Sequence, residues 1–268
     1  GAADQQCRAR LVVLAAGPDS PLRAQLGIAA HTRDYQRGAV LATLTLEKSP
    51  GGCAWERFTD SGPIALLPLP ALPGTAADGH SPGSVHRASL VWTLPPARAA
   101  ALAIAPPAEF IAALRAEFGD RAGPVTGVGD RQLHPLRRVL AEEQIRSNLV
   151  LVGNAAHSLH PVAGQGFNLA LRDLGALTEV LADAAPNQLG EIGVLQRYLA
   201  RQLRDQQRTT LFSDRLPALF AGDRGWPSGM VAHAASMGLI ALDLLPPARA
   251  AFTRLGAGLL TREARLHG

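Results

Sequence analysis

The chain has 268 residues and a mass of 28.1 kDa, with 47% hydrophobic and 18% charged side chains. This length and composition suit one large or two modest domains with a real core, and they exclude general disorder. The net charge is +4, yet Lys48 is the only lysine and the arginines are spread along the chain without a basic tract. With 4% aromatic residues for base stacking and no recognition motif, we expect no nucleic-acid partner.

Cysteine usage and the N-terminus indicate a reducing, cytoplasmic compartment. Cys7 and Cys53 are the two cysteines, and the first residues have neither a basic region nor an apolar run typical of a secretory signal. Gly225–Leu242 is uncharged and close to membrane-spanning length, but it contains proline, serines and glycines. We expect a packed helix there, with peripheral contact at the inner membrane or a membrane-spanning helix as the alternatives.

The first half of the chain predicts a mostly antiparallel sheet. Arg10–Gly17 is continuously apolar and ends in glycine, which is typical of a strand buried on both faces of an α/β sheet. In the next strand Val40, Ala42, Leu44 and Leu46 alternate with residues that point the other way. The strands expected in this sheet are Gly38–Leu46, Ala54–Thr59, Pro63–Leu69 and Val85–Leu94.

A connector and a helix follow the sheet. Pro95–Pro107 is rich in proline and alanine and is expected to be a connector, whereas Pro107 opens a helix that Gly119 ends. On that helix Phe110, Ile111, Leu114 and Phe118 share a face. Arg131–Leu136 has the character of another strand.

The second half returns to α/β character and ends in helices. Asn148–Val152 is a continuous buried-strand run, and a loop rich in glycine and proline leads from it to a helical pattern from Phe167. The expected apolar face of that helix carries Leu171, Leu174, either Leu177 or Thr178, and Leu181. From Leu189 the chain is helical to about Phe220, with Arg201, Arg204, Asp205 and Arg208 on its polar face. From Met230 it reads as helices broken at Pro246.

The loop before Phe167 is the segment that indicates chemistry. Gly164 and Gly166 allow the backbone to approach a ligand where a helix begins, and the first amides of the helix, at the positive end of its dipole, favour negative charge. The alternative is a glycine-rich turn that binds nothing.

The block from Leu149 to Asp173 resembles the third FAD fingerprint of the flavoprotein aromatic hydroxylases, which runs GDxxH, PxxGxGxN and then D. Asn154 stands where most members have Asp. This block and Trp55–Pro68 look like the ubiquinone-biosynthesis branch of that family, of UbiH type. The resemblance implies an FAD site at Gly17, Gly153, Asn154, Pro161, Gly164, Gln165, Gly166, Phe167 and Asn168, with no metal.

Two departures accompany the resemblance. The family's second fingerprint is matched by the run from Leu11 through Gly17 to Ser20 and Arg23, but Ala16 replaces its Asp, and a methyl group cannot accept hydrogen bonds. This substitution argues against reduction of the flavin by a pyridine nucleotide. The GxGxxG unit that opens the family's sequences has no match, so we expect a C-terminal part of such an enzyme that binds FAD poorly or not at all and is inactive alone.

The resulting expectation is an α/β (α+β) fold with four parts. Residues 1–30 are a remnant of a Rossmann-like FAD-binding domain, residues 31–145 an antiparallel substrate-binding sheet domain, residues 146–188 the third FAD motif, and residues 189–268 a C-terminal helical region. The resemblance implies an FAD-dependent monooxygenase that uses NAD(P)H and O2 to hydroxylate a polyprenylated phenol in ubiquinone biosynthesis, within a complex of biosynthetic proteins.

Three histidines near the motif are candidates for a base that ionises the phenol: His134, His157 and His160. For each, the alternative is a loop histidine satisfied by the backbone. Two other functions remain open at this point, a non-catalytic scaffold subunit derived from the same family and a hydroxylase of another phenol.

Overall fold

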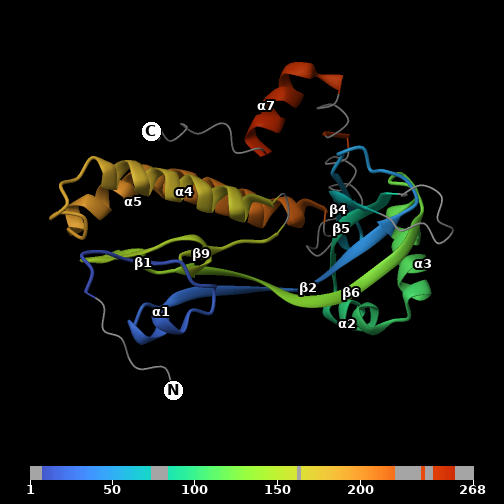
Figure 1. Cartoon of the computed structure of the whole chain (residues 1–268), viewed down its shortest axis with the longest axis horizontal. Helices are drawn as coiled ribbons and strands as arrows, with labels where there is room; N and C mark the ends of the chain where they lie inside the picture. Colours follow the sequence, from blue (N-terminus) through green and yellow to red (C-terminus); the bar gives the residue numbers. More distant parts are fainter. Residues whose placement is uncertain (1–7, 74–83, 162–163, 221–236, 239–243, 257–268) are drawn as a thin grey trace. The chain divides into compact units, whose positions relative to one another are not determined.

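The computed structural model describes residues 8–73, 84–161, 164–220, 237–238 and 244–256 (Figure 1). The chain divides into two compact units. The first contains residues 1–33, 137–216 and 236–268, and the second contains residues 34–136 and 217–235. Each unit is described by itself below.

A six-stranded sheet with strand order β3-β4-β5-β2-β6-β9 supplies the framework of the second unit. Its strands are β2 (Ala30–Leu46), β3 (Trp55–Thr59), β4 (Gly62–Pro73), β5 (Ser84–Leu94), β6 (Val125–Ala141) and β9 (His157–Ser158). Residues of β2 and β6 belong to both units, and β9 belongs to the first. The pairs β2–β5, β3–β4, β4–β5 and β6–β9 are all antiparallel, which confirms the predicted antiparallel sheet.

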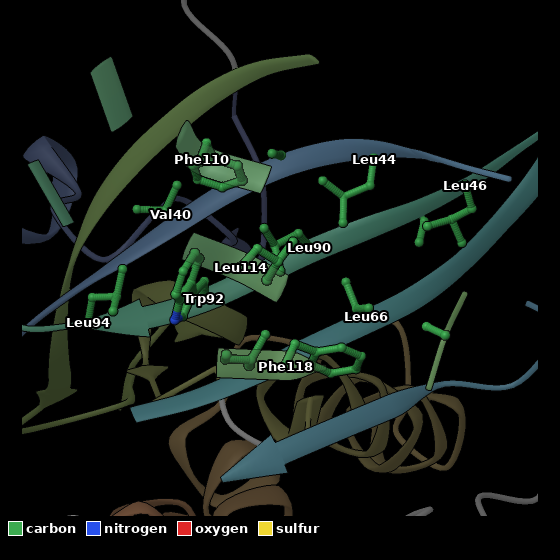
Figure 2. Packing of buried hydrophobic residues seen from close by; sticks show 14 of the residues in the cluster. Val40, Leu44, Leu46, Leu66, Leu90, Trp92, Leu94, Phe110, Leu114 and Phe118 are labelled. Atoms are coloured by element: carbon green, nitrogen blue, oxygen red, sulfur yellow. The ribbon is translucent and has the colours of Figure 1, made fainter. Parts of the chain in front are cut away.

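The core of the second unit lies between one face of this sheet and two helices. Val40, Ala42, Leu44 and Leu46 are buried as the alternation predicts, and α3 (Pro107–Phe118) covers them with Phe110, Leu114 and Phe118. Figure 2 shows the three α3 side chains directed toward the apolar side chains of β2, β4 and β5. Trp92 of β5 meets Phe110 edge to face, with 5.7 Å between the ring centroids.

The prediction of a connector at Pro95–Pro107 is wrong, because α2 (Pro96–Ile104) occupies most of it. Proline is well placed in the first turn of a helix, and the alanines that follow have the highest helix propensity. Proline at both ends therefore bounded a helix. The prediction for α3 is confirmed, and Gly119 ends it with a φ of 79°.

The first unit is built on a three-stranded sheet of order β1-β8-β7, with β1 (Val12–Leu14), β8 (Leu149–Leu151) and β7 (Ile145–Arg146). β8 is fully buried, as the sequence predicts. The prediction that the strand at Arg10–Gly17 is buried on both faces is wrong, since Val12 and Val13 are 51% and 45% exposed. β1 is short and lies at the edge of the described sheet, so one side of it meets no other strand there.

Helices α4 (Gln165–Ala182) and α5 (Ile192–Phe220) run side by side in this unit (Figure 1). Arg172 of α4 pairs with Asp205 of α5 at 2.6 Å. The predicted apolar face of α4 is partly wrong, because Leu171 and Leu174 are 50% and 41% exposed. In this leucine- and alanine-rich helix two faces satisfy a helical period, and the buried one carries Leu169, Asp173, Ala176, Leu177 and Val180.

The remaining described elements are α1 (Pro21–Gln25), the 3-10 turn η1 (Gly153–Ala155) and α7 (Pro246–Gly256). Among the residues that the structure describes, no helix combines the length and apolar character needed to cross a bilayer. Of the uncharged stretch Gly225–Leu242, residues 237–238 are described and the rest lie outside the described residues. Cys53 is free and exposed, and Cys7 lies outside the described residues.

Candidate cofactor site

Parallel pairing of β1 and β8 brings the two fingerprint segments to the same end of the sheet, where both strands finish. Leu14 is opposite Leu151, and the amide of Val152 donates to the carbonyl of Leu14 at 3.1 Å. The chain runs from β1 to Gly17 and from β8 to Gly153, so both loops leave the carboxyl ends of adjacent parallel strands. In open α/β sheets ligands bind at the carboxyl ends of the strands.

Arg23 ties these two loops together. Ser20 caps α1 by accepting a hydrogen bond from the amide of Arg23 at 3.2 Å. The buried guanidinium of Arg23 donates to the carbonyl of Pro18 at 2.7 Å and to that of Ala155 at 2.9 Å. Sequence reasoning matched Ser20 and Arg23 to a fingerprint but missed this contact, because the spacing Ser-x-x-Arg does not say which distant carbonyl the arginine reaches.

The start of α4 is open and uncapped. Gly164 precedes the helix in the left-handed conformation, with φ 60° and ψ 20°, and neither a side-chain cap nor an acidic residue satisfies the first turn. A Cβ at Gly164 or Gly166 would meet no heavy atom within 4 Å, and Phe167 is 72% exposed. Among the described residues, the first turn of this 18-residue helix therefore has open space at both glycines, and its uncapped amides lie at the positive end of the helix dipole. Such a cradle fits the anionic edge of a planar ring such as reduced flavin.

The other residues expected to contact FAD differ in exposure. Gly17, Asn154 and Pro161 are exposed, Gly153 and Asn168 are half-buried, and Gln165 is buried. Among the described residues no cluster of His, Cys, Asp and Glu is arranged to hold a metal ion. The open positions and the exposed Asn154 amide are compatible with a large polar cofactor.

His157 lies in a buried pair with Asp173. Its Nε2 is 2.5 Å from Oδ2 of Asp173, and both side chains are buried. The second oxygen of Asp173 accepts a hydrogen bond from Gln206 of α5 at 3.1 Å, and Gln206 exchanges two amide hydrogen bonds with Gln144. His157 Nδ1 has no hydrogen-bond partner among the described residues. The fingerprint's His and Asp are thus in direct contact.

His160 is buried and uncharged at neutral pH. Burial lowers its pKa from 6.5 to about 4, although the negative charge of Asp214 opposes the shift. Asp214 itself pairs with Arg138 and lies 3.6 Å from Arg33. His134 is exposed on β6 in the second unit, with Nε2 3.4 Å from Oε1 of Gln132. The first unit therefore contains His157, His160 and the fingerprint, whereas His134 belongs to the second.

A groove of about 530 Å³ lies elsewhere in the first unit, lined by residues that include Arg10, Asn148, Glu191 and Gly193. It is adjacent to the residues that precede β1 and β8, whereas the fingerprint loops follow these strands. Because ligands of α/β sheets bind at the carboxyl ends of strands, we place the candidate site at the start of α4.

Residues 1–212 match the family described as "FAD binding domain", and the chain belongs to this family. The fold class is α/β, with helices and an antiparallel sheet. Ubiquinone hydroxylase UbiL of Rhodospirillum rubrum is 36% identical over 258 residues, covering 96% of this chain and 56% of that protein. The 3-demethoxyubiquinol 3-hydroxylase of Escherichia coli is 37% identical over 202 residues, covering 74% of this chain and 47% of that protein. The chain spans about half the length of these relatives.

The fold is also found in solved structures. The crystal structure of PqsL, a probable FAD-dependent monooxygenase from Pseudomonas aeruginosa, matches with a TM-score of 0.61 at 23% identity, covering 79% of this chain and 56% of that one. This likeness supports the fold. The family match assigns the chain to the FAD-binding proteins, and the solved structures share its fold.

Proposed function

We propose that this chain is part of an FAD-dependent monooxygenase that hydroxylates the aromatic ring of a polyprenylated phenol in ubiquinone biosynthesis. The observation that carries the proposal is the open, uncapped start of α4 beside two loops joined by Arg23. The names of the relatives, a ubiquinone hydroxylase and a demethoxyubiquinol hydroxylase, support the substrate class. Within this branch the sequence looks most like the UbiH type, which hydroxylates 2-octaprenyl-6-methoxyphenol.

In this proposal each part of the chain has a separate role. FAD, when bound, supplies the redox and oxygen-transfer chemistry, with NAD(P)H as co-substrate. The backbone amides of Gly166, Phe167 and Asn168 stabilise negative charge on the flavin ring, and Asn154 contacts the ribityl chain. Residues 1–30 and 146–188 form the cofactor side, residues 31–145 the substrate-binding sheet, and residues 189–268 the helical region. The remaining proposed contacts come from Gly17, Gly153, Pro161, Gly164 and Gln165.

The histidines differ in what they offer a phenol. His160 is neutral at pH 7, so a ring nitrogen can accept a proton, but a pKa of about 4 makes it a weak base there. His157 has Nε2 engaged by Asp173. His134 is exposed in the second unit. We keep all three as candidates for the group that activates the phenol.

A matched pair of glycine substitutions tests the flavin site. Gly166 is the second residue of α4 and Gly193 is the second residue of α5, and a Cβ at either would meet no heavy atom within 4 Å. We expect Gly166→Ala to weaken FAD binding about tenfold, because the methyl group would occupy the space that the ring needs. Gly193→Ala should leave binding unchanged. The measurement is a titration that follows quenching of flavin fluorescence, repeated with riboflavin.

The outcomes of this titration are distinct. Saturable binding that Gly166→Ala weakens and Gly193→Ala does not supports the proposal. An equal loss in both variants, or saturable binding that Gly166→Ala leaves unchanged, contradicts it.

A scaffold subunit is the second candidate function, and Ala16 is the observation that favours it. The family has Asp at this position after the strand, and alanine offers no acceptor. If FAD binds but neither NADH nor NADPH reduces it, and Ala16→Asp restores reduction, the scaffold reading gains support. Oxygen consumption of the full-length protein with short prenylphenols and with polycyclic phenols then separates the ubiquinone branch from a hydroxylase of another phenol.

We also propose peripheral contact with the inner membrane and with a complex of biosynthetic proteins. A polyprenylated phenol partitions into the bilayer, so an enzyme acting on it must reach the interface. Flotation with liposomes of anionic phospholipid checks this, and a chain that stays wholly in the aqueous fraction contradicts it.

A further inference from the structure

The buried face of α4 contains one carboxylate where apolar residues would suffice. Asp173 is wholly buried in the same face as Leu169, Ala176, Leu177 and Val180. A buried carboxylate is costly unless it is paired and hydrogen-bonded. Its presence in this row therefore points to a role that packing alone does not require.

Asp173 is held on both of its oxygens. Oδ1 accepts from Gln206 at 3.1 Å and Oδ2 contacts Nε2 of His157 at 2.5 Å. Tyr198 of α5 is also buried. Burial raises the pKa of its phenol, and the negative charge of Asp173 raises it further. Because a carboxylate only accepts, Nε2 of His157 donates the hydrogen bond to Asp173, and Nδ1 has no hydrogen-bond partner among the described residues.

His157 lies in β9, within the connection between β8 and α4; the loop below means residues Gly153–Pro161 of this connection. The loop is held at its beginning by two further contacts, from the amide of Ala141 to the carbonyl of Ala156 at 2.8 Å and from Arg23 to Ala155 at 2.9 Å. The pair of His157 and Asp173 adds a direct bond from this loop to the body of α4. It brackets the helix start, with one partner before Gly164 and the other after it.

We propose that Asp173, fixed by Gln206, is a positioning residue: it sets the tautomer of His157 and thereby the position of the loop from Gly153 to Pro161 relative to the first turn of α4. This inference rests on the proposed function, because that loop is the one assigned to the flavin. Asp173 touches neither the cofactor nor the substrate in this assignment and acts through His157.

Asp173→Asn tests the proposal, with Asp183→Asn as its matched control. Both are aspartates of the α4 segment, but Asp183 is exposed at the end of the helix. The tautomer is read from the ¹⁵N resonances of His157, assigned by comparison with His157→Gln. We expect a protonated Nε2 and a bare Nδ1 in the unchanged chain, and loss of this fixed state in Asp173→Asn. Hydrogen exchange of the amides from Gly153 to His160 should accelerate about tenfold in Asp173→Asn and stay unchanged in Asp183→Asn.

FAD titration of the same variants separates the two hypotheses. Weaker FAD binding in Asp173→Asn, recovered in Asp173→Glu, together with the tautomer change, supports a positioning role. A mixed or Nδ1-protonated tautomer in the unchanged chain, or equal exchange in both aspartate variants, overturns it. A faster-exchanging loop with unchanged FAD affinity also overturns it, because the pair would then serve the fold alone. The proposed function fails separately, if Gly166→Ala leaves flavin affinity unchanged, and the tautomer and exchange report on the pair whether or not flavin binds.

Should Asp173→Asn not fold, Gln206→Leu replaces it. This variant keeps the His157–Asp173 pair and removes the second bond to the carboxylate. We expect a smaller acceleration of exchange in the same loop amides, and unchanged exchange there overturns the proposal.

Discussion

The two units of the chain bury different kinds of side chain. In the second unit the described core is made of leucine, valine, alanine, isoleucine, tryptophan and phenylalanine, and Thr93 is its one buried polar residue. Among the described residues of the first unit, ten polar or charged residues are buried: Ser20, Arg23, His157, His160, Gln165, Asp173, Gln202, Gln206, Thr209 and Ser213. Apolar burial stabilises a fold by itself, whereas buried polar groups need specific partners. The interior of the first unit therefore depends on specific polar contacts as well as on apolar packing.

The largest expected effect tests the apolar side of this comparison. Phe110→Ala removes a fully buried ring from between α3 and the sheet and should lower the free energy of unfolding by about 3–5 kcal/mol. Phe167→Ala removes an exposed ring and should change it by less than about 0.5 kcal/mol. Urea unfolding followed by circular dichroism measures both. Similar losses in the two variants would contradict the assignment of the core.

Lowering the pH should reduce the free energy of unfolding through the buried His160 of the first unit. The folded chain binds a proton at His160 only near pH 4, whereas the unfolded chain binds it near pH 6.5. This contribution to stability is therefore complete above pH 6.5 and is lost as the pH falls toward 4, by up to about 3 kcal/mol. His160→Gln should flatten the profile of unfolding free energy in this window, and His134→Gln controls for loss of an exposed imidazole. An unaltered slope in His160→Gln would show that another group is responsible.

A glycine of the second unit should show how closely its backbone packs. Gly62 has a φ of 136°, and a Cβ there would lie 2.4 Å from the carbonyl oxygen of Thr93. Gly62→Ala should cost about 1–3 kcal/mol from strain and steric overlap together. Gly52→Ala, with a φ of 71° and open space, isolates the conformational part and should cost less. Thermal melts compare the two, and an equal cost would remove the steric contribution.

The smallest expected effect is at the start of α4. Gly166→Ala and Gly193→Ala replace glycine in a helix without a steric conflict, so stability should stay constant or rise by about 0.5 kcal/mol in both. A loss above about 2 kcal/mol in Gly166→Ala alone would mean that the helix start is packed by protein, and the cofactor site would have to be abandoned. Differential scanning calorimetry provides the measurement.

Local patterns predicted much of the fold. The alternation at Val40 and Leu44, the helix that ends at Gly119 and the buried run at Leu149–Leu151 each follow from neighbouring residues, and the structure confirms them. The connector at Pro95–Pro107 was wrong because proline begins helices as well as interrupting them. The face of α4 was partly wrong because the position of the sheet and of α5, which no local pattern encodes, chose between two apolar stripes.

The sequence by itself determined the antiparallel sheet, the long helices α3, α4 and α5, and the family to which the chain belongs, since these depend on short-range periodicity and on the fingerprint before α4. Tertiary structure decided which polar groups meet. Arg23 reaches Ala155, and Asp173 reaches both His157 and Gln206, because parallel pairing of β1 with β8 and the packing of α4 against α5 bring distant residues together. Contacts of this kind depend on how elements pack in three dimensions, and spacing along the chain does not record them.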